Sequence, residues 1–339
     1  MDLSLILVIV TIGLALFFDF LNGFHDAANS IAAMVSTRLL KPHWAVLWAA
    51  FFNFVAFLFF GVHVATTIGV GLVNPEVITI HVILSALLGA IFWNIFTWYY
   101  GLPSSSSHAL IGGLLGASIA HAGLEPLKWL GICKVLSAIV ISPLLGMIMA
   151  MILMMIIARL FFHSTPTKVE GWFHKLQFLS SAFISLGHGS NDAQKTMGII
   201  AMLLFSSHLI DGRFYIPFWV VISCNFVIAL GTLFGGWRVV KTMGMRITKL
   251  RPASGFCSDT GSAITLALAT SLGIPVSTTH TVTGAIIGVG SLNGFGAVRW
   301  GVAKNIVWAW ILTIPAAGAV AATVFSVIQL FLTDVAITF

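Results

Sequence analysis

The sequence predicts an all-α integral membrane protein, built from two inverted repeats with broken or re-entrant helices. Hydrophobic residues make up 59% of the 339 positions and charged residues only 8%, whereas a soluble domain carries roughly 25% charged residues. Two polar motifs each occur twice along the chain. The apolar runs are far longer than the roughly ten-residue segments of a membrane β-barrel, which favours a helical bundle.

The first duplicated motif surrounds an aspartate. Asn22–Ala32 (NGFHDAANSIA) recurs at His188–Gly198 (HGSNDAQKTMG), so Asp26 and Asp192 occupy matching positions in predominantly apolar sequence. An ionised aspartate at mid-membrane costs about 2.5–3.5 kcal/mol on insertion scales, and such residues are usually functional. A salt bridge or a buried helix cap explains one such residue more easily than a matched pair. We therefore predict that both acids are functional.

The second duplicated motif is a hydroxyl cluster. GLPSSSSHALIGG begins at Gly101 and GIPVSTTHTVTGA begins at Gly273, 172 positions later. The same offset relates Asn53 to Asn225, so the landmarks indicate one duplicated unit. The predicted organisation is a first transmembrane repeat at residues 1–162, a linker at 163–174 and a second repeat at 175–339, together forming one membrane domain.

Apolar runs and glycines place the helices of the first half. Leu3–Leu21 is expected to be the first span rather than a cleaved signal peptide, because no basic region precedes it. We expect this span to end at a break at Asn22-Gly23. The elements that follow are a half-helix or re-entrant piece at Phe24–Val35, a span at Trp44–Phe60, a loop at Gly61–Val77, a span at Thr79–Tyr100, a helix from the serines after Pro103 to about Ala120, and an apolar run ending near Phe162.

The second half repeats this plan with a different charge pattern. A break at His188–Asn191 is expected to precede a short helix through Ile199, and a span begins at Pro217. The loop Gly235–Arg251 carries five basic residues, whereas its first-half equivalent has no lysine or arginine. Because positive charge favours the cytoplasmic side, this contrast predicts inverted repeats with loop 235–251 in the cytoplasm. The net charge of +6 then reflects orientation, not nucleic-acid binding.

The acids and their neighbours form a candidate cation site. Glycines beside each acid are expected to break the helices and to free backbone groups for ion binding. Lys195 is the one cation inside a motif, and it either neutralises Asp192 or contacts an anion. The candidate cation-coupling residues are Asp26, Asp192, Asn22 and Asn191.

The hydroxyl clusters form a candidate anion site. Each lies beside a proline at the expected start of a helix, where free N–H groups and about half a positive charge favour an anion. Hydroxyls at such places also cap helices or permit close packing, but the duplication favours anion binding. The candidate anion-binding residues are Asn29, Ser105, Ser106, Ser107, Lys195, Ser277, Thr278 and Thr279. The supporting residues are His25, His108, His280, Asn53 and Asn225. We call the anion site formed by the two hydroxyl clusters the cradle, and we expect His108 and His280 to fix it by hydrogen bonding.

Charge then suggests a mechanism. Two aspartates and a doubly charged anion place about −4 in a low-dielectric site, so cations must enter with the anion. This predicts an inverted-repeat transporter that works by cation symport rather than an enzyme. Two other classes stay open: an anion channel, which needs no buried acids, and an intramembrane aspartyl protease, which needs a pair of them. Three isolated cysteines fit no disulfide, zinc or redox motif, and no cofactor or resident metal is predicted.

The four motifs resemble those of the inorganic phosphate transporter (PiT) family. NGFHDAAN and HGSNDAQK match its duplicated acidic signature, and GLPSSSSH and GIPVSTTH match its paired hydroxyl segments. The resemblance covers essentially the whole chain. It implies phosphate as the substrate, bound with cations between the repeats, and by position it implicates Asp26, Asn29, Asp192, Ser105–Ser107 and Ser277–Thr279.

Two features of this sequence differ from the family's pattern and indicate which branch it resembles most. Sodium-coupled members carry glutamates where this chain has Asn53 and Asn225, so the chain is most similar to the bacterial low-affinity Pit branch. That similarity implies proton-coupled import of phosphate, alone or as a complex with a divalent metal, with sodium coupling as the alternative. The large hydrophilic central loop of many members is missing. The expected setting is the bacterial inner membrane, and the expected partners are inorganic phosphate, the coupling cation, the lipid bilayer and a second copy in a homodimer.

Overall fold

The computed structural model describes residues 3–210 and 212–337, which form twelve α-helices joined by short turns. The first six helices are α1 (Leu3–Ser36), α2 (Pro42–Val55), α3 (His63–Val70), α4 (Ile80–Tyr99), α5 (Ser106–Ala122) and α6 (Trp129–Leu160). The last six are α7 (Pro166–Ser206), α8 (Phe218–Phe234), α9 (Trp237–Lys241), α10 (Pro252–Ser271), α11 (Thr278–Ser291) and α12 (Trp300–Ile337). The described chain has no β-sheet, which confirms the predicted all-α class.

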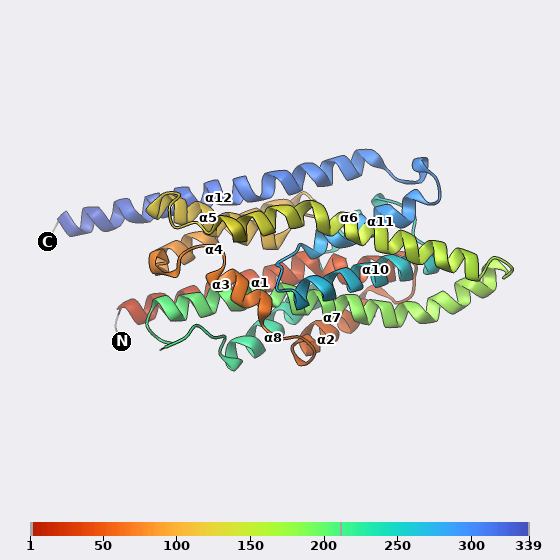
Figure 1. The fold of residues 1–339 in the computed structure, drawn as a ribbon, viewed down its shortest axis with the longest axis horizontal. Coiled ribbons are helices and arrows are strands. Elements are labelled where there is room, and N and C mark those ends of the chain that lie inside the picture. Colours follow the sequence, from red (N-terminus) through yellow and green to blue (C-terminus); the bar gives the residue numbers. More distant parts are fainter. Residues whose placement is uncertain (1–2, 211, 338–339) are drawn as a thin grey trace.

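The helix order repeats, and the repeats run in opposite directions. Ile80 and Tyr99 bound α4, and Pro252 and Ser271, each 172 positions later, bound α10. Figure 1 shows α1 and α6 running away from the end of the molecule that holds both termini, whereas α7 and α12 run back towards it. This antiparallel relation between matching helices agrees with the predicted inversion.

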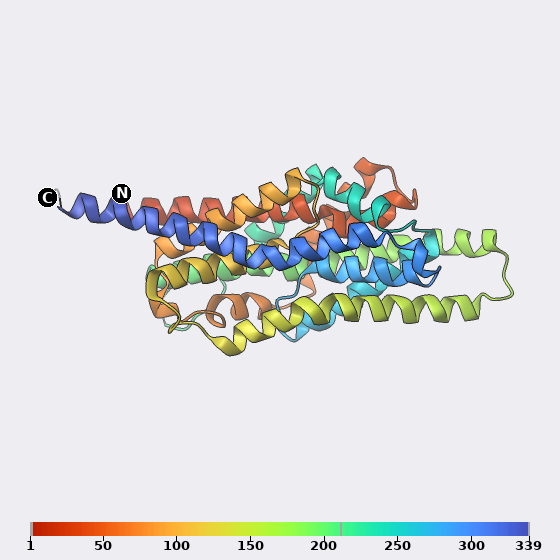
Figure 2. The same cartoon turned by 90° about the horizontal axis from the view of Figure 1, so that it is seen from above.

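The two halves interlock. The long helix α12 packs along α4 and α5 of the first half, and its counterpart α6 packs along α10 and α11 of the second half. In the same way α1 packs against α8, and α7 packs against α2. Figure 2 shows the resulting elongated bundle, in which neither half stands apart from the other.

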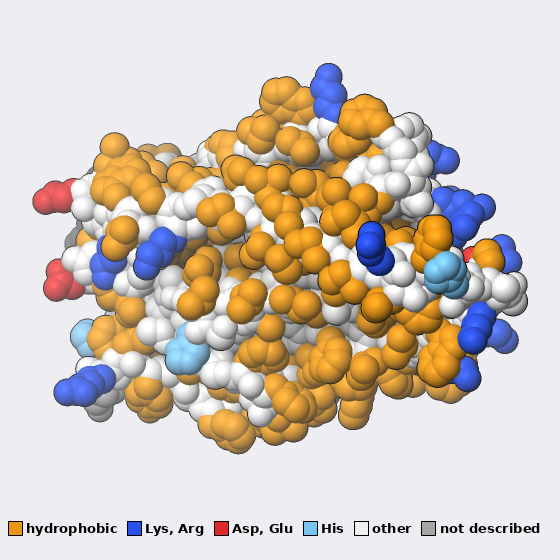
Figure 3. Space-filling model, turned by 45° about the vertical axis from the view of Figure 1, so that its right-hand side comes forward, with side chains coloured by type: hydrophobic (Ala, Val, Ile, Leu, Met, Phe, Trp, Pro, Cys, Tyr) orange, Lys and Arg blue, Asp and Glu red, His pale blue; other side chains and the backbone are white. Residues whose placement is uncertain are grey.

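The dimensions and surface fit a bilayer. Four helices are long and apolar enough to cross a membrane: α1, α4, α6 and α12. Two pairs of helices are bent, by 80° between α2 and α3 and by 63° between α8 and α9. If each pair is counted as one span, the number of spans rises from four to six. Figure 3 shows hydrophobic side chains along the flank and most lysines and arginines of that view at the end opposite the termini. The chain is a multi-pass integral membrane protein.

The expected helix breaks at the acidic motifs are wrong. α1 continues through Asn22-Gly23, and α7 continues through His188–Asn191. The glycines instead permit close helix contact: a Cβ on Gly23 would lie 2.1 Å from the carbonyl oxygen of Ile228 in α8. A Cβ on Gly189 would lie 2.5 Å from the carbonyl oxygen of Asn53 in α2. These matched contacts join the two halves.

The chain does break at the hydroxyl motifs. Gly101 (φ 65°) and Gly273 (φ 66°) adopt the left-handed backbone conformation that favours glycine. Each follows the end of a 20-residue helix, and the next helix folds back against it, so α4–α5 and α10–α11 form two helical hairpins. The broken and re-entrant helices that the sequence predicts are therefore present, at these tips and at the two bent pairs.

Three segments expected to be irregular are largely helical. The loop predicted at Gly61–Val77 contains α3, and the basic loop Gly235–Arg251 contains α9 and a π-helical turn at Thr242–Arg246. Most of the linker expected at 163–174 belongs to α7, which begins at Pro166. In each segment, residues that face the bundle pack into it, as Ile68 and Val239 do. Tertiary contacts thus extend helices into stretches whose polarity suggested loops.

Candidate functional site

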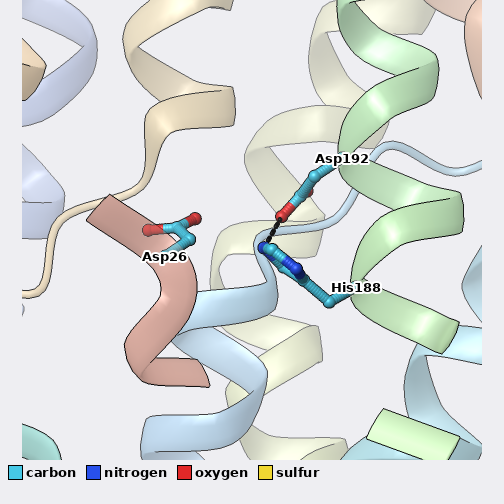
Figure 4. A group of neighbouring side chains, drawn as sticks. All are labelled: Asp26, His188 and Asp192. Carbon is cyan, nitrogen blue, oxygen red and sulfur yellow. Dashed lines mark ion pairs between the residues drawn. The ribbon is translucent and has the colours of Figure 1, made fainter. Parts of the chain in front are cut away.

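The two motif acids meet at the centre of the bundle. Asp26 of α1 and Asp192 of α7 are both buried, with 3% and 0% of the residue surface exposed. With His188 of α7 they offer three ligand atoms that lie within 4.8 Å of one another (Figure 4). Two carboxylates and an imidazole are ligands that several cations accept. The structure thus brings together the acids that the duplicated motif singled out.

Lys195 and the two hairpin tips surround Asp192. Lys195 lies one turn after Asp192 on α7 and pairs with its Oδ1. The Lys195 ammonium also donates to Ser107 Oγ of the first tip and, at 2.7 Å, to the carbonyl oxygen of Val276 at the second tip. Thr278 donates to Asp192 Oδ2 at 3.0 Å. One lysine therefore neutralises an acid and holds both tips against α7.

Asp26 is bonded by other residues than those around Asp192. His25 Nδ1 lies 2.7 Å from Asp26 Oδ1, and Thr279 donates to the same oxygen at 3.3 Å. Asn29, one turn further along α1, donates to Thr279 Oγ1 at 3.0 Å. The tip of the second hairpin therefore bonds to both acids, through Thr278 to one and Thr279 to the other.

The two hydroxyl clusters start helices in the same way. Ser105 caps α5 and Ser277 caps α11, each accepting the backbone N–H three residues later at 3.2 Å. These two serines act as helix caps, whereas Ser107, Thr278 and Thr279 direct their hydroxyls at the acids. The positive ends of two helix dipoles therefore lie beside the acids. Ser106 is buried, and its hydroxyl has no hydrogen-bond partner among the described residues.

The histidines after the clusters contact each other. The rings of His108 and His280 lie 4.7 Å apart, and His280 stacks on Trp310 at 3.9 Å. Within the described chain, neither ring hydrogen-bonds to the hydroxyls of the tips. The expectation that the rings fix the cradle by hydrogen bonding is therefore wrong. The two rings instead pack against each other, and His280 packs against Trp310 of α12.

The asparagines divide into two groups. Asn53 Oδ1 accepts a hydrogen bond from His188 Nδ1 (3.2 Å), and its amide nitrogen donates to Thr232 (2.8 Å), which joins Asn53 to the site. Asn191 donates to Thr270 of α10, and Asn225 donates to the carbonyl oxygen of Val221. Asn22 is buried, with a side-chain oxygen that has no donor among the described residues. The hydrogen bonds of Asn22, Asn191 and Asn225 in the described chain do not reach the acids.

His188 is the site residue that sequence reasoning missed. It lies four residues before Asp192 on α7, and its Nε2 lies 3.1 Å from Asp192 Oδ2. Positions i and i+4 share one face of a helix, so the spacing itself carried the signal. The break expected between the two residues concealed that signal, because a broken helix gives no such register.

The whole chain is similar to known proteins. A family model described as the phosphate transporter family matches residues 22–321. A protein of Rhizobium meliloti named "Probable low-affinity inorganic phosphate transporter" is 61% identical over 93% of this chain and 95% of its own. A Bacillus subtilis protein of the same name is 43% identical over 97% of this chain and 99% of its own.

The fold is similar to a solved transporter structure as well. A structure described as "The sodium-dependent phosphate transporter" superposes with a TM-score of 0.88 at 29% identity, over 96% of this chain and 99% of the other. The family match covers both acidic motifs and both hairpin tips described above. With its interlocked halves and its paired acids, this chain belongs to the phosphate transporter family.

Proposed function

We propose that this protein imports inorganic phosphate across the bacterial plasma membrane by cation symport, with protons as the coupling ion. The observation that carries the proposal is the meeting of two buried acids with two hydroxyl-bearing helix N-termini. Neither an anion channel nor a protease requires both features together. The relatives named above are transporters and not enzymes, which supports the same reading.

The hairpin tips supply the anion site in this proposal. The N-termini of α5 and α11 present free N–H groups, and the hydroxyls of Ser107, Thr278 and Thr279 extend this donor array. Lys195 adds a full positive charge, and Asn29 adds an amide donor. The three hydroxyls and Lys195 now bond to the acids, and on phosphate binding they turn to its oxygens.

The acids supply the cation site. Asp26, Asp192 and Lys195 carry a net charge of about −1 with neutral histidines, so a doubly charged phosphate brings the centre to about −3 in a low-dielectric region. Cations must therefore bind together with the anion. Protons are favoured by the resemblance described above, because Asn53 and Asn225 stand where sodium-coupled members carry glutamates. Sodium is the second candidate, favoured by the sodium-dependent structural relative and by the converging ligands Asp26, His188 and Asp192.

Alternating access fits the inverted arrangement. The hairpin α4–α5 inserts from the end that holds the termini, and α10–α11 inserts from the other end (Figure 1). Each tip is held by the other half: Thr242 of the π-helical turn donates to Gly101, and Thr67 of α3 donates to Gly273, at 2.9 and 2.8 Å. We propose that breaking one of these contacts at a time opens the site to one side.

The charge distribution sets the orientation that we propose. Lysines and arginines gather at the end opposite the termini, which places that end and loop 235–251 in the cytoplasm (Figure 3). A homodimer, predicted above, is tested by measuring the mass of the detergent-solubilised protein.

Uptake of radiolabelled phosphate into proteoliposomes tests the function. An imposed proton gradient, or in the second candidate a sodium gradient, should drive accumulation above the external concentration. Flux that ignores both gradients would indicate a channel. Peptide cleavage without phosphate flux would indicate a protease.

A further inference from the structure

A second acid of α1 lies outside the site described above. Asp19 is two turns before Asp26 and is completely buried, with 0% of its surface exposed. Its Oδ1 accepts a hydrogen bond from Thr196 of α7 at 2.8 Å. Its Oδ2 has no hydrogen-bond donor among the described residues. A buried carboxylate oxygen without a partner requires an explanation, because such groups are almost always satisfied.

The surroundings of Asp19 supply no cation. Lys195 is the only lysine or arginine buried in the described chain, and it is paired with Asp192. The helices packed along α1 here are α7, α8 and α4. The titratable groups that face Asp19 from α7 and α8 are Asp192 and Cys224, which interact with it electrostatically. The ionisable side chains of α4, His81 and Tyr99, lie at its two ends.

An ionised Asp19 would therefore be an uncompensated charge in the membrane interior, which is costly. Binding a proton removes that charge and turns one carboxyl oxygen into a donor. Asn22 lies one turn further along the same face of α1, and its buried side-chain oxygen lacks a donor.

We propose that Asp19 is the carboxyl group that binds and releases the co-transported proton. This inference rests on the proposed function and assigns its coupling ion to a residue outside the phosphate cradle. A metal ion fits Asp19 poorly, because hard cations take several oxygen ligands. Asp19 does not belong to the converging group formed by Asp26, His188 and Asp192, and its neighbour Cys224 offers sulfur.

Thr196 connects the proton site to the phosphate site. It follows Lys195 directly in α7 and donates to Asp19, while Lys195 holds Asp192 and the two hairpin tips. Asp19 and Asp192 repel each other when both are ionised. Protonation of Asp19 therefore lowers the negative charge that an arriving phosphate meets. By linkage, bound phosphate must favour the proton on Asp19 to the same degree.

The substitution Asp19→Asn tests the assignment in proteoliposomes. Two quantities are measured: accumulation of labelled phosphate under an inward proton gradient, and exchange of labelled phosphate at equal pH on both sides. Because the amide cannot release a proton, the variant should lose at least 90% of the gradient-driven accumulation. Exchange should stay within about twofold of wild type, since the cradle keeps all its residues.

Asp259→Asn is the matched control. Asp259 of α10 is also buried, and one of its carboxyl oxygens also lacks a partner in the described chain. It lies near Gln177, which is four turns of α7 away from Asp192. The control should keep both accumulation and exchange. Asp19→Glu, which preserves the acid, should restore gradient-driven accumulation.

Wild-type accumulation by Asp19→Asn would overturn the inference and leave phosphate transport intact. The proposed function itself fails if wild type neither exchanges nor accumulates phosphate, or if its phosphate flux ignores both ion gradients. If Asp19→Asn does not insert, infrared spectra of wild type and Asp19→Glu replace it. A protonated-carboxyl band that titrates and shifts in Asp19→Glu supports the assignment, and an identical band in both proteins overturns it.

Discussion

Thr279 donates a hydrogen bond to Asp26 although 253 residues separate them in the sequence. The contact places the second hairpin tip of one half on the acidic motif of the other. Thr278, its neighbour, reaches Asp192 in the opposite direction. Two adjacent hydroxyls thus bind the two acids, and a movement of this one tip alters both. In the proposed mechanism, this relation links phosphate binding at the tip to cation binding at the acids.

The acids should be indispensable for coupled uptake. We expect Asp26→Asn and Asp192→Asn to lose gradient-driven phosphate accumulation at least tenfold while the protein still inserts, because the amides hold no positive companion. Accumulation by labelled-phosphate uptake, normalised to inserted protein, measures the effect. Near-normal accumulation by either variant would refute the role given to that acid.

The hydroxyls of the tips should set phosphate affinity. Replacing a hydrogen bond to a charged group costs about 1.5–3 kcal/mol, so Ser107→Ala and Thr279→Val should each weaken phosphate binding by about tenfold or more. Ser118→Ala is the control, because Ser118 is also buried on α5 but lies three turns beyond the tip. Equilibrium binding of labelled phosphate in detergent measures the phosphate affinity of each variant. Equal affinities for Ser107→Ala and Ser118→Ala would count against the cradle.

Lys195 should matter for stability as well as transport. Removing one partner of a buried ion pair costs about 3–5 kcal/mol, because the other charge is left alone. Lys195→Met should therefore lower the thermal unfolding midpoint sharply, and the double variant with Asp192→Asn should recover part of the loss. Additive losses in this cycle would mean that the two side chains do not act as a pair.

The glycines near the acids should act in packing. Gly23→Ala should destabilise the protein by about 3 kcal/mol or more, because the new Cβ would meet the Ile228 carbonyl oxygen at 2.1 Å. Gly13→Ala, on the same helix with nothing within 4 Å of the added Cβ, should be neutral or stabilising. Thermal unfolding in one detergent compares the two. If Gly23→Ala leaves the thermal unfolding midpoint unchanged, a flexible helix break at Gly23 is favoured instead.

Membrane topology tests the inversion. Reporters placed at Asn74 and at Lys241, in matching regions of the two repeats, should face opposite sides of the membrane. The positive region around Lys241 should be cytoplasmic. Labelling by a membrane-impermeant reagent reports the side, and a same-side result would end the inversion argument.

The sequence predicted much of this architecture because its signals are local or repeated. Composition indicated a helical membrane protein, and the matched motifs identified Asp26 and Asp192 before their meeting was known. Gly101 and Gly273 ended helices as the turn chemistry suggests. Each of these inferences needs only a residue type and its near neighbours.

The features that were not predicted from the sequence depend on long-range packing. Gly23 and Gly189 look like breaks, yet each faces a carbonyl oxygen of the other half, and only the fold reveals that contact. His188 was overlooked because the supposed break removed its helical register with Asp192. The edge-to-face contact of His108 with His280 likewise joins residues 172 positions apart, and no local pattern encodes it.

The central claim is that phosphate binds between the two acids, Asp26 and Asp192, and the two hairpin tips. Cryo-electron microscopy of the protein with bound phosphate tests it most directly. The account predicts phosphate oxygens within hydrogen-bond distance of Ser107 and Thr279, next to Asp26 and Asp192. Phosphate bound away from both tips, with the acids still bonded to the tip hydroxyls, would contradict it.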